Sequence, residues 1–224
     1  MAQLDFSEQV TVVVGTANKH FTVPKCFRTK TCDFFKACCN GQWKEATFKK
    51  VDLPDADTDA FAAYLQWLCT GEVVVAEDAR DTVTSESPSE ERDRVAREQY
   101  APFIELAVLA DMVGDTTCGN AVVDATIELL CRISAGPTWE EMRVVYDKLP
   151  TATGVRRAFV DWCARSLDVE ELEEFRPTWV SYTDLTFDVM AKALKIARGE
   201  ACEQPSAVNS CKYHEHNDKV PKCI

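Results

Sequence analysis

The chain has 224 residues, of which 46% are hydrophobic and 28% are charged. These proportions are typical of a folded globular protein and argue against a disordered or fibrous one. The formal net charge of −12 argues against nucleic acid and anionic membranes as partners, because both bind proteins through clustered Lys and Arg, so we expect neither.

The first 54 residues contain signals for three strands and one helix. VTVVV (10–14) and HFTVPK (20–25) are strand-like runs on either side of a short polar turn, and together they predict a hairpin. Residues 27–39 have the apolar spacing of a helix. TFKKVDLP (47–54) predicts a third strand that ends at its proline.

The next segment is predicted to be a helix, a short strand and a charged insertion. The helix begins after Asp57 or Thr58, either of which can cap it, and ends at Gly71. EVVVA (72–76) predicts the strand. Residues 77–98 hold eight acidic and four basic residues and almost nothing apolar, so we expect an acidic, disordered insertion.

The chain is then predicted to be helical as far as residue 198. Helical spacing resumes at Tyr100, and the segment 118–131 is apolar on most sides, as a central helix would be. Two further helices are predicted at 139–148 and 154–166, and a last one at 183–198. The apolar face expected of this last helix consists of Phe187, Met190, Leu194 and Ala197.

This order of elements, and the wording of several segments, resembles the BTB/POZ domain. The segments that carry the likeness are VTVVVG, HFTVPK, CDFFKACCNGQWKEAT, VDLPDADTDAFAAYLQWLCTGEV and YAPFIELAVLADMVGDTTCGNAVVDATIELL. VVYDKLPTATGVRRAFVDWCA resembles the helical extension of BTB proteins that are common in filamentous fungi. The resemblance implies an α+β fold, a small β-sheet capped by a cluster of helices, followed by an α-helical C-terminal extension. The expected domains are a BTB/POZ domain over 9–131, with the insertion at 77–98, a helical extension over 137–198, and an irregular Cys/His-containing tail over 199–224.

The chain contains eleven cysteines, which we expect to be reduced because no secretion signal precedes them. Cys26, Cys32, Cys38 and Cys39 cluster near the first helix, but no pair has the C-x-x-C spacing of a zinc knuckle or redox site. In the pattern of the resembled family, Cys39 stands where a core leucine is usual. We therefore interpret these thiols as small buried hydrophobic groups.

The resemblance also implies a partner for the segment that follows the first helix. Trp43 and Glu45 match a hydrophobic-x-Glu pattern that contacts the cullin scaffold in BTB adaptors of ubiquitin ligases. An exposed ring with a carboxylate two residues away is a suitable interface anchor. The predicted function is a non-catalytic protein–protein interaction module that serves as a substrate adaptor for a cullin-type ubiquitin ligase. The alternative is that Trp43 merely covers the sheet.

No catalytic residues are predicted, because the common catalytic and nucleotide-binding motifs are absent and the chain has only three histidines. The tail is the exception to this shortage of reactive groups. Cys211, His214, His216 and Cys223 supply two thiols and two imidazoles within 13 residues, enough for the tetrahedral shell that zinc prefers.

Several observations argue against zinc in the tail. In an extended chain His214 and His216 point to opposite sides, the spacing matches no common zinc finger, and Cys202 can replace one of the ligands. The competing interpretation is a disordered tail without a cofactor. If the metal site does exist, an alternative function is a metal-dependent regulator of transcription that associates with nucleic acid through the tail.

The expected assembly is a monomer or a weak oligomer. Only nine residues precede Val10, whereas the strand-swapped dimers of the resembled family need a further helix and strand upstream. The N-terminal residues have no secretion pattern, and no apolar stretch approaches the roughly 20 residues of a membrane helix. We therefore expect a cytoplasmic or nuclear protein.

Overall fold

The structure is a computed structural model. It describes residues 8–24, 32, 34–35, 50–74, 88–133, 136–166, 168–174, 176–200, 204–205, 207–217 and 220–223. The strands are β1 (Gln9–Val14), β2 (Lys19–Pro24) and β3 (Lys50–Leu53). The helices are α4 (Thr58–Thr70), α5 (Pro88–Met112), α6 (Thr116–Ile133), α7 (Trp139–Lys148), α8 (Gly154–Ser166), α9 (Val169–Glu174), α10 (Arg176–Ser181), α11 (Thr183–Ala197) and the 3-10 helix η2 (Ala207–Tyr213).

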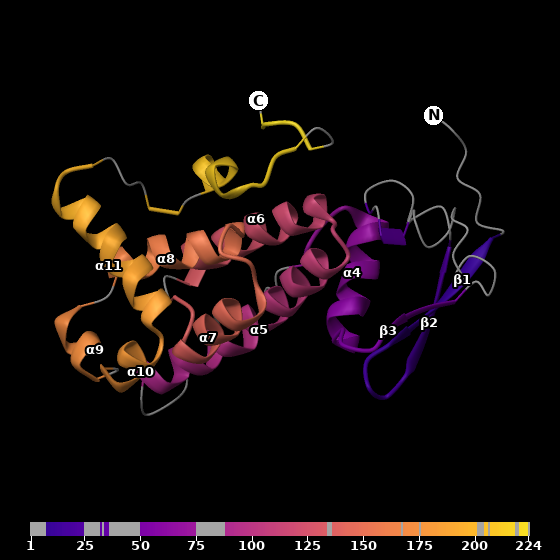
Figure 1. The fold of residues 1–224 in the computed structure, drawn as a ribbon, viewed down its shortest axis with the longest axis horizontal. Helices are drawn as coiled ribbons and strands as arrows, with labels where there is room; N and C mark the ends of the chain where they lie inside the picture. The colour runs from indigo at the N-terminus through magenta and orange to yellow at the C-terminus, as the bar shows by residue number, and fades with distance from the viewer. Residues whose placement is uncertain are drawn as a thin grey trace.

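The sheet has the strand order β2-β1-β3 and forms one end of the molecule (Figure 1). β1 pairs antiparallel with β2, as the predicted hairpin requires, and parallel with β3. Val12 and Val14 of the central strand are fully buried. The predicted hairpin and third strand are confirmed, and the fold is of the predicted α+β class.

The helix α4 begins and ends at its predicted residues for clear local reasons. The carboxylate of Asp57 accepts hydrogen bonds from the backbone N–H groups of Asp59 and Ala60, which are otherwise without an intrahelical partner. Gly71 adopts the left-handed conformation, with φ of 78°, that terminates many helices. Phe61 and Tyr64 are buried, as the predicted apolar spacing requires.

Asp115 joins α4 to α6. Its carboxylate accepts a 2.8 Å hydrogen bond from the Tyr64 hydroxyl and a 3.0 Å hydrogen bond from the backbone N–H of Cys118. The side chains of Tyr64 and Asp115 are both buried, where water cannot reach them. Each therefore provides the hydrogen-bond partner that the other needs. The contact fixes the N-terminal end of α6, the helix on which the candidate site is built.

The segment between α4 and α5 differs from its prediction in two respects. Residues 72–74 are not in a strand, and residues 75–87 lie outside the described part of the chain. The helix α5 begins at Pro88, so residues 88–98 of the expected disordered insertion are helical. The high charge and the lack of apolar residues predicted disorder, whereas proline is well suited to the first turn of a helix.

The helical extension occupies the other end of the molecule, where α7, α8, α9, α10 and α11 lie (Figure 1). The bounds of α7 and α8 agree with the predicted 139–148 and 154–166. The face predicted for α11 is wrong. Leu185 and Val189 are buried in the packing of α11 against α8, whereas Phe187, Met190 and Leu194 are exposed.

Cys32 is the one cysteine of the predicted cluster near the first helix that the structure describes. All seven cysteines in the described ranges are free. Cys32 is buried, its thiol donates a 2.9 Å hydrogen bond to the carbonyl oxygen of Val113, and burial raises its pKa. It therefore has the properties of a core residue rather than of a nucleophile. Cys26, Cys38 and Cys39 lie outside the described residues.

Candidate metal centre

The tail beyond α11 turns back across the helical bundle and lies along α6 and α8 (Figure 1). Its anchor is Tyr213, which is 2% exposed and donates a 3.0 Å hydrogen bond to the buried carboxylate of Asp161 on α8. Tyr213 lies directly over Gly154 at the start of α8. A Cβ atom at Gly154 would lie 2.1 Å from the Tyr213 carbonyl oxygen, so only glycine leaves room for the tail.

Two further side chains hold the tail backbone in place. Arg157 donates hydrogen bonds of 2.7 Å and 2.8 Å to the carbonyl oxygens of Lys212 and Tyr213. Asn120 of α6 both donates to the carbonyl oxygen of Glu215 at 2.9 Å and accepts from its N–H at 2.8 Å. The backbone on either side of His214 is therefore tied to two helices.

This docking brings the four predicted ligands together. The ligand atoms of Cys211, His214, His216 and Cys223 all lie within 4.8 Å of one another. His214 Nδ1 is 3.1 Å from Cys223 Sγ, and His216 Nε2 is 3.5 Å from Cys211 Sγ. Ligand atoms of a tetrahedral zinc site with ordinary bond lengths are about 3.3–3.8 Å apart, so the four atoms fit a zinc ion after small adjustments.

Outer hydrogen bonds assign the tautomer of each imidazole. His214 Nε2–H donates a 2.8 Å hydrogen bond to the carboxylate of Asp124 on α6, which leaves the lone pair of Nδ1 facing Cys223. His216 Nδ1–H donates a 3.0 Å hydrogen bond to the carbonyl oxygen of Pro221, which leaves the lone pair of Nε2 facing Cys211. Metal-binding histidines usually donate their second N–H to a carboxylate or carbonyl in this way.

The two thiols are neighbours, since their sulfur atoms lie within 4.8 Å of one another. That contact lowers the pKa of Cys211 and raises the pKa of Cys223. Cys211 and both histidines are partly buried, and Cys223 is exposed. The four groups therefore lie at the surface, where a metal ion from solution can reach them.

The expected conflict between His214 and His216 does not arise, because the chain bends at residue 214 and is not a strand there. The two rings lie 6.0 Å apart and use different nitrogen atoms, so both lone pairs face the same point. Asp124, Asn120 and Gly154 could not be assigned to this site from the sequence, because they lie far from the tail in the chain. The alternative ligand Cys202 is outside the described residues.

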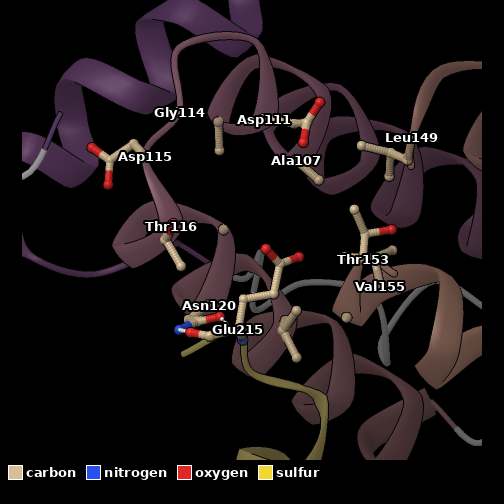
Figure 2. Close-up of a pocket in the computed structure, with 14 residues that line it drawn as sticks. Ala107, Asp111, Gly114, Asp115, Thr116, Asn120, Leu149, Thr153, Val155 and Glu215 are labelled. Carbon is tan, nitrogen blue, oxygen red and sulfur yellow. Dashed lines mark hydrogen bonds between the residues drawn. The ribbon is translucent and has the colours of Figure 1, made fainter. Parts of the chain in front are cut away.

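A cavity of about 80 Å³ lies beside these four side chains and is lined by residues of α5, α6, the turn after α7 and the tail. Figure 2 shows the carboxylate of Glu215 reaching into this cavity between Asn120 and Thr153. Burial and the negative charge of Asp111 raise the pKa of Glu215. Glu215 lies between His214 and His216 in the chain, so the residue that reaches the cavity is adjacent to both imidazoles.

Of the other predicted site residues, Trp43 and Glu45 lie outside the described part of the chain, so the structure does not place them. His20, the remaining histidine, is exposed on β2. None of the helices that the structure describes is both long and apolar enough to cross a membrane.

The sequence model of the BTB/POZ domain family matches residues 3–87, which include the sheet and α4. This part of the chain is therefore a BTB/POZ domain, a kind of module that generally mediates protein–protein interaction. The match ends just before α5 begins, so the extension of the domain to residue 131 stays a prediction. No curated protein matches the chain.

The outer hydrogen bond to His214 gives the first testable prediction. The change Asp124→Ala removes the acceptor that orients the imidazole, and zinc affinity is expected to fall about 10- to 100-fold. Competition with a chelator of known zinc affinity measures the loss. Glu128→Ala, one helical turn away and also exposed, removes the same charge without touching a ligand. An equal loss in both variants would show that Asp124 acts only through its charge.

Proposed function

We propose that this protein is a non-catalytic BTB/POZ interaction module whose C-terminal tail is folded by a structural zinc ion against α6 and α8. The convergence of Cys211, His214, His216 and Cys223 supports the zinc ion more directly than any other observation. Four protein ligands fill the shell of a tetrahedral ion and leave no open position for a substrate. This favours a structural role over a catalytic one.

The contribution of the ion follows from the shape of the tail. Among the side chains of residues 199–224 that the structure describes, Tyr213 is the large apolar one that reaches the core. A segment with so little buried surface gains most of its order from its ligands, because metal binding supplies free energy of folding. Zinc therefore turns the tail into a fixed part of the surface over α6 and α8.

Metal analysis of the purified full-length chain tests this role. One zinc ion per chain is the expected result, and its removal by a chelator is expected to make the tail sensitive to protease while α6 and α8 stay protected. A chain that purifies without metal and binds no added zinc at micromolar concentration would contradict the proposal.

We further propose that the partner of the BTB/POZ domain is a cullin scaffold and that the protein is a substrate adaptor for a cullin-type ubiquitin ligase. The support is the Trp43-x-Glu45 pattern, which lies inside the matched residues 3–87.

The alternative, a regulator that binds nucleic acid through the tail, has less support because the net charge is −12. DNA binding that weakens with salt would favour that alternative.

The change Trp43→Ala tests the cullin contact. If the ring is an interface anchor, its loss is expected to cost about 2 kcal/mol of binding free energy, or roughly thirtyfold in affinity for the cullin, with folding largely spared. Isothermal titration with purified cullin and a thermal melt measure the two effects. A loss of about 3–5 kcal/mol in the free energy of unfolding, with affinity unchanged, would instead place Trp43 in the core.

A further inference from the structure

The last helix, α11, carries apolar side chains on two opposite faces. Leu185 and Val189 are buried on the face that packs against α8. On the opposite face Phe187, Met190 and Leu194 are 72%, 58% and 54% exposed. These three residues are spaced by three and four, so they form one continuous row, which we call the outer stripe. Contiguous exposed apolar surface of this kind marks interaction sites.

Charged residues accompany the outer stripe along one flank. Asp184 lies at the start of α11, and Lys195 and Arg198 lie at its end. All three are exposed, and at 100° per residue they fall on the same side of the stripe. The helix thus has an acidic and a basic end on one flank, and it lies at the end of the molecule away from the sheet (Figure 1).

This pattern is self-complementary. When two copies of a helix pack antiparallel about a twofold axis, the same flank of each helix faces the other, and the start of one lies opposite the end of the other. Asp184 then lies opposite Lys195 and Arg198 of the partner subunit, and the contact occurs twice. A parallel arrangement places equal charges at the same level and lacks this pairing.

We propose that the outer stripe of α11 binds the outer stripe of a second copy of this chain in an antiparallel pair. The interface consists of one four-turn helix from each copy, which is below the size of standard stable interfaces, so the dimer is weak. A dissociation constant of about 10–100 µM is expected. This association needs neither strand exchange nor the tail, and it is separate from the proposed zinc site.

Sedimentation velocity on the zinc-loaded full-length chain between about 5 and 500 µM tests the pairing. The expected weight-average mass rises from monomer to dimer across this range. Met190→Lys is expected to hold the chain as a monomer throughout, and circular dichroism checks its fold. Val74→Lys is the matched control, because Val74 is 59% exposed but lies outside α11. A wild-type chain that stays monomeric at every concentration, or a dimer that survives Met190→Lys, would overturn the proposal.

Exchange of the charges tests the antiparallel arrangement separately. Asp184→Lys alone and Lys195→Asp with Arg198→Asp are each expected to weaken the dimer about 3- to 10-fold. Asp184→Lys also makes the net charge of the chain less negative. If only general repulsion between the two copies mattered, this variant would bind its partner more tightly, not more weakly. The variant with all three changes is expected to regain wild-type affinity. Failure of that variant to regain it would overturn the antiparallel pairing.

Discussion

Replacing Cys211 and Cys223 together by serine is expected to weaken zinc binding about a thousandfold or more, because serine does not supply a thiolate ligand. The bound ion stabilises the native state by about 4 kcal/mol when its concentration is a thousand times the dissociation constant. For a chain of this size that corresponds to a fall of about 8–16 °C in Tm. Differential scanning calorimetry of both chains in the presence of zinc measures this difference in Tm.

The control for the cysteine variant is Cys69→Ser, which removes an exposed thiol far from the tail. It is expected to leave both zinc content and Tm unchanged. Chelator treatment of the wild-type chain is expected to lower Tm as much as the double substitution does. If the double variant retained the wild-type Tm and one zinc ion, the metal would have to lie elsewhere in the chain.

Gly154→Ala is expected to displace the tail without altering any ligand. The added Cβ atom would lie 2.1 Å from the Tyr213 carbonyl oxygen and 2.6 Å from Val123 Cγ2, so the backbone of the tail must move. Overpacking of this kind costs about 1–3 kcal/mol, and the loss of the buried Tyr213 ring increases that cost. We expect a lower free energy of unfolding, weaker zinc binding and faster amide exchange over residues 207–217.

Gly119→Ala is the matched control, since Gly119 lies inside α6 and a Cβ atom there meets nothing within 4 Å. This change is expected to stabilise the protein by about 0.5–1 kcal/mol, because alanine favours the helical conformation. If Gly154→Ala behaved like Gly119→Ala, with zinc affinity unchanged, the tail would not need its close contact with α8.

The parts of the fold that depend on neighbouring residues could be predicted from the sequence. Asp57 caps α4 and Gly71 ends it because both effects act within one helical turn. The grouping of Cys211, His214, His216 and Cys223 could also be predicted, since they lie within 13 residues. The surface on which the tail docks was not predictable, because His214 and its acceptor Asp124 are 90 positions apart in the chain.

The error in α11 has a different cause. Leu185 and Val189 form one apolar row and Phe187, Met190 and Leu194 form another, so the helical period fits either face. Spacing alone does not show which row packs against α8. The outer stripe is therefore identified by the structure alone. When a helix has two apolar faces, its sequence does not show which face is buried.

The central claim, a zinc ion held by the tail, is tested most directly by X-ray absorption at the zinc edge of the purified full-length protein. The predicted spectrum has two sulfur ligands at about 2.3 Å and two imidazole nitrogens at about 2.0 Å, with no oxygen ligand. A shell of oxygen and nitrogen ligands without sulfur, or the absence of bound zinc, would contradict the assignment of Cys211, His214, His216 and Cys223 as the metal site.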